Sequence, residues 1–154
     1  MILYHGSNIE ITEIDLALSK PNKDFGKAFY LSANRDQALE MANYKTALFG
    51  GEAVVSKFEF DENISDLQVL NFPGYSKEWA EFVFLNRDKN NKTPHGYDIV
   101  YGPIANDRVG LQIINYKEGI ISFEEFLERL KFFRGITFQY AFCTQESLKK
   151  LKKI

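Results

Sequence analysis

The sequence has little cysteine and little histidine, and both shortages exclude classes of site. Its single cysteine, Cys143, excludes an internal disulfide and any metal site built from several cysteines. The two histidines, His5 and His95, have no cluster of further ligands beside them in the sequence, so we expect no metal. A long linker of proline, glycine and serine is also absent. We therefore expect one domain over residues 1–154.

The chain also lacks an excess of either charge and a long apolar run. Nineteen basic residues stand against 21 acidic ones, and the net charge of −2 favours neither a nucleic acid nor an anionic membrane as partner. No segment approaches the roughly 18 apolar residues that cross a bilayer. Because the N-terminus has neither the basic stretch nor the apolar run of a signal peptide, we expect a cytoplasmic location. We expect Lys149, Lys150, Lys152 and Lys153 to end a helix and complement its dipole.

Apolar side chains are plentiful enough for a core. They make up 45% of the chain, including 14 phenylalanines, which excludes a disordered protein. Helices are predicted after the capping boxes Asn34/Gln37 and Ser122/Glu125, and around Trp79. Because helices and strands do not alternate strictly, we expect an α+β fold. Short apolar or alternating runs predict strands at residues 2–4, 27–32, 53–60, 98–101 and 136–143.

Glycine-rich and polar segments are predicted to interrupt these elements. Gly50-Gly51 should end the first helix, and Gly102-Pro103 should form a turn after the strand at 98–101. Residues 86–96 form the best loop, which leaves His95 in solvent. The charged residues 106–108 follow a buried strand, where they could serve function or form an ordinary Asx turn, and both alternatives stay open.

The strand at 136–143 has two unlike faces. Ile136, Phe138, Tyr140 and Phe142 point one way, and the smaller Thr137, Gln139, Ala141 and Cys143 point the other way. A small, polar face can form the floor of a cleft. It can equally meet solvent or a helix.

Two short segments near the N-terminus place a histidine and a tyrosine beside glycines and hydroxyls. The first is Tyr4-His5-Gly6-Ser7, and the second, residues 25–32, reads FGKAFYLS and contains Tyr30. Each residue taken alone is ordinarily structural. Together they can grip a flat polar ring such as nicotinamide, because Gly6 exposes its backbone and a tyrosine ring can stack. NAD is therefore the first ligand to expect.

The same segments resemble motifs of a known family. Residues 3–7 (LYHGS) resemble the "WHGS" motif of the ADP-ribosyltransferases of the diphtheria-toxin and poly(ADP-ribose) polymerase branch. Residues 25–32 resemble their F-G-x-G-x-Y-F motif, with Ala28 at the second glycine. The next helix, with Asn34, Gln37, Ala38 and Tyr44, resembles their "SKSAxY" segment. The chain is also similar to small, mostly bacterial and phage domains of this superfamily, in which a stretch like residues 97–107 (YDIVYGPIAND) precedes the final strand.

The resemblance implies a fold and a reaction. It implies an ADP-ribosyltransferase-like fold of split, mixed, mainly antiparallel sheets with flanking helices. It also implies NAD-dependent mono-ADP-ribosyl transfer to a macromolecule with release of nicotinamide, in a toxin or effector that has a cognate inhibitor protein. The acceptor is expected to be a protein rather than a nucleic acid. The implied catalytic residues are His5, Tyr30 and Gln139, and the implied NAD-binding residues are His5, Gly6, Ser7, Gly26, Tyr30 and Tyr44.

Gln139 stands where the family has a glutamate. Cleavage of the glycosidic bond of NAD leaves positive charge on the ribose, which a carboxylate stabilises. Glutamine keeps the hydrogen bond and loses the charge, at a cost of about 3 to 4 kcal/mol in barrier. Three alternatives stay open: the target supplies a carboxylate or nucleophile, another acid substitutes, or the domain is a nucleotide-binding or protein-interaction module without turnover.

Three acids are candidates for that substitution: Glu59, Asp61 and Glu146. Glu146 follows Thr144, an expected N-cap, so we interpret it first as a helix-start carboxylate. Transfer of an RNA 2′-phosphate to NAD, another reaction of the superfamily, needs arginines in the cleft. The net charge of −2 disfavours it.

Overall fold

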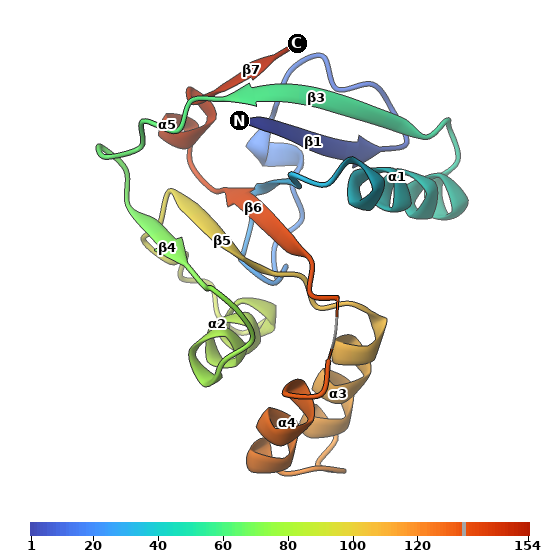
Figure 1. Ribbon diagram of the computed structural model, residues 1–154, viewed down its shortest axis with the longest axis vertical. Coiled ribbons are helices and arrows are strands. Elements are labelled where there is room, and N and C mark those ends of the chain that lie inside the picture. Colours follow the sequence, from blue (N-terminus) through green and yellow to red (C-terminus); the bar gives the residue numbers. More distant parts are fainter. Residues whose placement is uncertain (134) are drawn as a thin grey trace.

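The strands form two separate sheets in the computed structural model, which describes residues 1–133 and 135–154 (Figure 1). The first sheet has the order β1-β3-β7 and contains β1 (Ile2–Ser7), β3 (Val54–Phe60) and β7 (Leu151–Lys153). The second has the order β2-β6-β5-β4 and contains β2 (Phe29–Leu31), β6 (Phe138–Phe142), β5 (Ile99–Pro103) and β4 (Val69–Asn71). The β4–β5 pair is parallel and the other pairs are antiparallel.

Helices flank the two sheets. Helix α1 (Arg35–Phe49) lies beside β1, whereas α3 (Asp107–Lys117) and α4 (Phe123–Leu130) lie at the far end of the molecule (Figure 1). The others are α2 (Lys77–Arg87), the short α5 (Gln145–Leu148) and a 3₁₀ turn, η1 (Leu16–Leu18). As predicted, Asn34 and Ser122 accept hydrogen bonds from the first turns of α1 and α4, and Gly50 ends α1. No helix among the described residues is long and apolar enough to cross a membrane.

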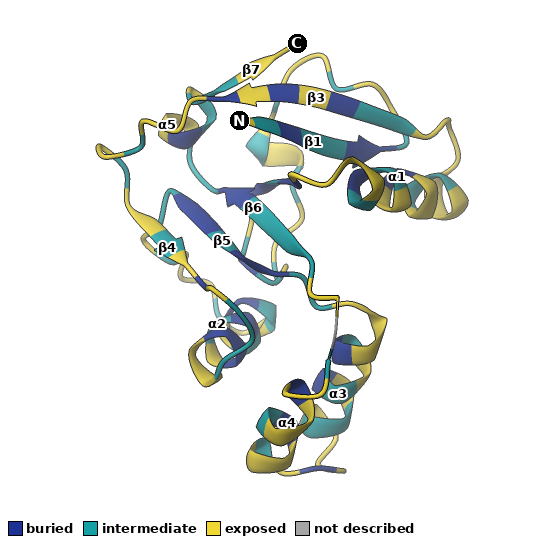
Figure 2. Cartoon of the chain, viewed as in Figure 1, coloured by how far each residue is buried: buried dark blue, intermediate teal, exposed yellow. Residues whose placement is uncertain are grey.

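The four-stranded sheet lies between two apolar cores. On one face, Phe29 and Phe142 pack against Leu3 and Phe58 of the three-stranded sheet. On the other face, a larger core forms around the buried Trp79 of α2. Buried positions accordingly concentrate on the strands, and the outer helix faces are exposed (Figure 2). The result is a single-domain α+β fold with mainly antiparallel sheets, as the sequence predicts.

The two sheets meet where β1 passes the end of β2. The N–H of Tyr4 donates to the carbonyl of Ser32 at 2.8 Å, and the N–H of Ser32 donates to the carbonyl of Tyr4 at 2.9 Å. Beyond this bridge the two strands diverge. The bridge therefore brings both N-terminal motifs together at one junction.

Two predictions of secondary structure are wrong. Gly102 and Pro103 continue β5 and face Gln139 and Phe138 of β6, so they form no turn. Lys152 and Lys153 belong to β7 rather than to a helix end, because β3 offers them a free edge, and lysine is common on edge strands.

The charged segment 106–108, for which two alternatives stayed open, lies at the start of α3. Asn106 is the N-cap, so these polar residues begin a helix rather than form a loop.

Candidate functional site

Gly6 lets α1 lie directly against β1. A Cβ atom at this position would collide with the carbonyl of Ala38, so no other residue fits without moving the helix. The side chains of Ala38 and Ala42 are buried at the same contact. The close approach also carries Lys45, further along α1, to the strand, where its Nζ donates to the Gly6 carbonyl at 3.0 Å.

The backbone of Gly6 points off the open edge of β1. Tyr4 uses its N–H and carbonyl to bond Ser32, on the side of β1 away from β3. Backbone groups of alternate residues in a strand point to the same edge. The N–H and carbonyl of Gly6 therefore point to that edge too, beyond the bridge between Tyr4 and Ser32. One donor and one acceptor side by side match a primary carboxamide.

His5 lies on the other face of β1 and donates a hydrogen bond to the backbone of β2. Its ring stacks on Phe29, with 4.2 Å between centroids, and its Nδ1 lies 2.7 Å from the Tyr30 carbonyl oxygen. A carbonyl only accepts, so Nδ1 carries the proton and Nε2 keeps a lone pair. Burial, reinforced by the charge of Lys45, lowers the pKa of His5 to about 4. The neutral ring can thus accept from a ligand hydroxyl at pH 7.

Two serine hydroxyls share the His5 face. Ser56 stands directly opposite His5 in the β1–β3 pair and is 4% exposed. Among the described residues its hydroxyl is the one buried side-chain polar atom without a partner. Ser7 is buried as well, and its Oγ accepts from the N–H of Ile9 at 3.4 Å. The Ser56 hydroxyl is therefore buried beside His5 without a partner in the described part of the chain, and Ser7 lies two residues further along the same face of β1.

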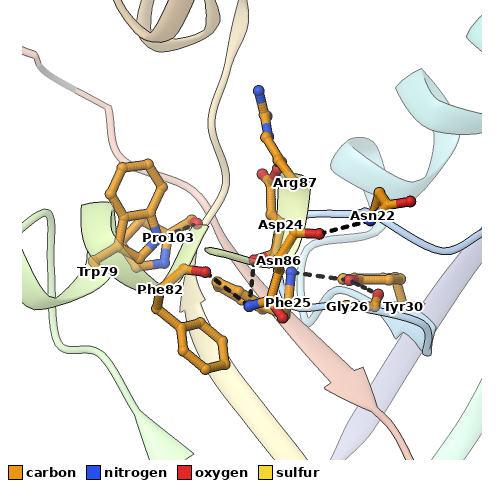
Figure 3. Close-up of polar contacts among 10 residues, drawn as sticks. All are labelled: Asn22, Asp24, Phe25, Gly26, Tyr30, Trp79, Phe82, Asn86, Arg87 and Pro103. Atoms are coloured by element: carbon orange, nitrogen blue, oxygen red, sulfur yellow. Dashed lines mark hydrogen bonds and ion pairs between the residues drawn. The ribbon is translucent and has the colours of Figure 1, made fainter. Parts of the chain in front are cut away.

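Tyr30 points to the opposite face of the four-stranded sheet from Phe29. Its hydroxyl donates to the Gly26 carbonyl at 2.6 Å and accepts from the Phe25 N–H at 3.1 Å (Figure 3). Gly26 adopts a φ of 81°, a left-handed conformation that favours glycine. Burial raises the pKa of Tyr30 well above its usual value. The glycine and tyrosine of the second motif therefore fasten the loop before β2.

The same loop is fastened to α2 and to the 86–96 loop. Asp24 forms an ion pair with Arg87, with 2.6 Å from Oδ1 to Nε, and Asn86 donates to the Asp24 carbonyl (Figure 3). Nε2 of His95 lies 2.7 Å from the Phe25 carbonyl. Residues 22–26 are consequently held in place from three sides.

The prediction that His95 is a solvated loop residue is wrong, because both ring nitrogens are used. Nε2 donates to Phe25, and Nδ1 accepts from the N–H of Tyr97 at 3.2 Å. The Cys143 sulfur lies 3.8 Å from Nε2, but burial raises the pKa of its thiol to about 12. His95 has no free lone pair to take the thiol proton, so this pair is not a nucleophile.

Gln139 lies on the same face of the sheet as Tyr30. Tyr30 pairs with Ala141 of β6, and Gln139 is two residues away from Ala141 along this strand. Tyr30 and Gln139 are therefore diagonal neighbours, which typically lie about 7–8 Å apart. Of the two unlike faces predicted for this strand, the small one covers the core at Ala141, and the bulky one meets the other core at Phe142. His5 contacts Tyr30 through the Tyr30 carbonyl, not through its ring.

The remaining predicted residues are spread over the surface. Tyr44 is 62% exposed on α1 and forms no aromatic pair with a described residue. Glu59 is exposed on one face of β3, and Ser56 lies on the other face. Asp61 accepts from the N–H of Asn63. Glu146 pairs with Lys149 in the first turn of α5, which confirms the helix-start interpretation. Within the described contacts, none of these acids reaches His5, Tyr30 or Gln139.

Hollows and ligand clusters elsewhere do not involve the two motifs. Hollows of about 370 and 440 Å³ lie along α2, bordered by α4 in one case and by Tyr116 and Phe123 in the other. In the part of the chain that the structure describes, no three histidine, cysteine or acidic side chains are grouped as metal ligands. The junction of β1 and β2 brings together His5, Gly6 and Ser7, whereas the Tyr30 ring and Gln139 lie on the other face of the four-stranded sheet.

Comparison with known sequences places the chain in a family. It belongs to the DUF3990 family, described as a protein of unknown function, whose profile matches residues 1–153. No curated protein matches the chain. The match extends over both motifs and over Gln139, so the site residues lie inside the family's domain.

Proposed function

We propose that the protein is an NAD-dependent mono-ADP-ribosyltransferase with an ADP-ribosyltransferase-like fold. The observation that carries the proposal is the junction of β1 and β2. There a neutral His5 offers Nε2 as an acceptor, and Gly6 offers an N–H and a carbonyl from the adjacent strand edge. The sequence motifs that contain these residues support the same assignment.

Each residue has a task that its geometry permits. The Gly6 N–H would donate to the carboxamide oxygen of nicotinamide, and the Gly6 carbonyl would accept from the carboxamide nitrogen. Lys45 already donates to that carbonyl, which has a second lone pair. Nε2 of His5 would accept from a ribose hydroxyl. Tyr30 holds the loop before β2, because its hydroxyl is fully used by Phe25 and Gly26.

The role of Gln139 in this proposal comes from the sequence resemblance, because its side chain lies on the Tyr30 face of the sheet and the His5 ring lies on the Phe29 face. When the glycosidic bond breaks, nicotinamide leaves with the bonding electrons and positive charge develops on the ribose. The Gln139 amide can orient a ribose hydroxyl but supplies no negative charge, and the missing charge lowers the rate about 10²- to 10³-fold. We therefore propose that a protein acceptor supplies the nucleophile, loses its proton on attack, and is modified once. The family resemblance adds a toxin-like role under the control of an inhibitor protein.

A second candidate is a module that binds NAD without turnover. Gln139 favours it, and so does the position of Glu59, Asp61 and Glu146, whose described contacts lie away from the junction. The two candidates share the binding site and differ in the release of nicotinamide.

The test is to measure nicotinamide released from NAD by the wild-type chain and by Gln139→Glu, without an acceptor. If Gln139 occupies the glutamate position, the new carboxylate should raise NAD hydrolysis by about 10²-fold. Gln145→Glu, on the exposed first turn of α5, is the matched control and should leave the rate unchanged.

Two outcomes would contradict the proposal. A folded Gln139→Glu chain with unchanged NAD turnover would show that Gln139 is not at the reacting ribose. Wild-type protein that releases no nicotinamide with any cell extract, and yet binds NAD that stays intact for days, would establish the binding module instead.

A further inference from the structure

Three helices border a hollow on the side of the four-stranded sheet that faces away from the three-stranded sheet (Figure 1). Its volume is about 440 Å³, and neither N-terminal motif reaches it. Aromatic, leucine and acidic side chains line it, most of them from α2 and its C-cap, with one aromatic ring each from α3 and α4. These lining residues are Glu81, Phe84, Leu85, Asp88, Tyr116 and Phe123.

The inner wall of this hollow is aromatic. Phe84 stacks on Tyr116 with 5.0 Å between the ring centroids, and Tyr116 contacts Phe123 with 5.4 Å between them. The three rings are partly buried and pack against the core around Trp79, so three helices fix their positions. Such a wall offers a partner apolar contact, and its ring faces attract a cation.

The outer rim of the hollow is a stripe on one face of α2. Glu81, Leu85 and Asp88 follow one another at intervals of four and three residues, which places them on the same side of a helix. The rise of about 1.5 Å per residue separates the two carboxylates by about 10 Å along the helix axis. Leu85 lies between them and is 55% exposed. The rim thus presents an apolar side chain flanked by two negative charges.

The charged residues that line the hollow are all acidic. Nζ of Lys77 lies 3.8 Å from the Glu81 carboxylate, but both side chains are about 60% exposed, and such a pair contributes little. Asp88 forms no ion pair within the described residues; its carboxylate accepts from the N–H of Asn90. The hollow therefore favours a positively charged occupant. Because Leu85 stands exposed at the rim, the hollow does not enclose a small molecule, and side chains of another protein fit it better.

We propose that Glu81, Leu85 and Asp88, with the aromatic hollow behind them, dock a basic amphipathic helix of a partner protein. That helix carries two arginines or lysines about two turns apart, with an apolar side chain between them that enters the hollow. The cationic groups pair with the two carboxylates, and their aliphatic stems lie along Leu85. The inference rests on this surface alone and not on the proposed function, because no lining residue belongs to the junction of β1 and β2.

The experiment is an NMR titration of the isotope-labelled chain with a synthetic peptide of about 15 residues, the length at which an isolated helix begins to form. The peptide has arginine, leucine and arginine at positions i, i+4 and i+7, and its control has glutamate in place of both arginines. The basic peptide should shift the amide signals of residues 81–88 and of Tyr116 and Phe123, and raised salt should weaken its binding. The acidic peptide and free arginine amide should shift none of them.

Variants of the rim locate the binding. Leu85→Lys should weaken binding of the basic peptide about 10-fold or more, because it sets like charges against each other and removes the apolar contact. Glu81→Gln and Asp88→Asn should each weaken it about 2- to 5-fold, the usual effect of losing an exposed charge pair. Leu111→Lys is the matched control, since Leu111 is 54% exposed on α3 and does not line the hollow. It should bind the peptide as the wild type does.

Four outcomes would overturn the docking surface. They are no binding of the basic peptide at about 1 mM, equal binding of the basic and acidic peptides, equal shifts with free arginine amide, and equal weakening by Leu85→Lys and Leu111→Lys. The third would leave a site for small cations, and the fourth would leave only a general effect of surface charge. None of these outcomes bears on nicotinamide release, so the proposed transferase stands or falls separately.

Discussion

His5 should make the protein sensitive to mild acid. The unfolded chain takes up a proton at this histidine near pH 6.5, whereas the folded chain takes it up near pH 4. Between these values the unfolded state binds more protons, so the free energy of unfolding falls as the pH is lowered and the loss is complete below about pH 4. At about 1.4 kcal/mol per pKa unit, the full loss is about 3 kcal/mol, of which about 2 kcal/mol has developed at pH 5.

The measurement is urea unfolding at pH 7.5 and pH 5 for the wild type and for His5→Gln. Glutamine can still donate to the Tyr30 carbonyl, but it does not titrate. The wild type should therefore lose about 2 kcal/mol more than the variant between these two pH values. Both proteins have the same carboxylates. Their contribution therefore cancels when the loss of unfolding free energy in the variant is subtracted from the loss in the wild type.

A direct titration checks the same point. The ring C–H signal of His5 in the NMR spectrum should keep its neutral position down to about pH 5 and shift near pH 4. A midpoint near 6.5, or equal losses of stability in the wild type and His5→Gln, would refute the argument that the ring is buried, neutral and protonated at Nδ1. Nε2 would then not be a dependable acceptor for a ligand hydroxyl at pH 7.

Two further substitutions test the contacts around the junction. Gly6→Ala should lower the free energy of unfolding by about 1–3 kcal/mol in urea denaturation, because its methyl group meets the Ala38 carbonyl. Gly74→Ala is the control and should have no comparable effect, because a methyl group there meets open space. Equal losses in the two variants would contradict the close approach of α1 to β1. Tyr30→Phe should lower the free energy of unfolding by about 1–3 kcal/mol, because it leaves the Phe25 N–H without its partner. A decrease no larger than that of Tyr116→Phe would show that this hydrogen bond contributes nothing to stability.

Local signals in the sequence were sufficient for the capped helices and for the alternating strand. Asn34 and Ser122 accept from the first turns of their helices, and this interaction spans only three residues. The strand predicted at 53–60 is β3, because one face of it is buried all along. Such features need no knowledge of distant partners, and they were predicted correctly.

Elements that depend on a distant partner could not be predicted in this way. Lys152 and Lys153 form a strand only because β3 leaves an edge free, and polar residues at the end of a chain carry no sign of this pairing. Similarly, Pro103 lies in β5 although proline usually ends a strand. It pairs with Phe138, and its carbonyl accepts from the indole N–H of Trp79 at 3.1 Å.

The candidate site shows the same difference between local signals and contacts with distant residues. The motifs predict His5, Gly6 and Tyr30 as site residues because each belongs to a short segment. The contact of Lys45 with Gly6 was missed because the two residues are 39 positions apart and Lys45 belongs to no motif. Folding brings them together through the packing of α1 on β1, and the sequence contains no local sign of that contact.

This arrangement also changes the role that the second motif suggests. Tyr30 was expected to stack on nicotinamide, but its hydroxyl fastens Gly26 and Phe25, while Asp24 is held by Arg87. These contacts fix the loop that precedes β2. The motif therefore acts through the loop that it holds, and Tyr30→Phe should speed hydrogen exchange of the Phe25 N–H even where no nicotinamide is present. Exchange of this N–H that is unaffected by Tyr30→Phe would restore direct contact with a ligand as the reason for the tyrosine.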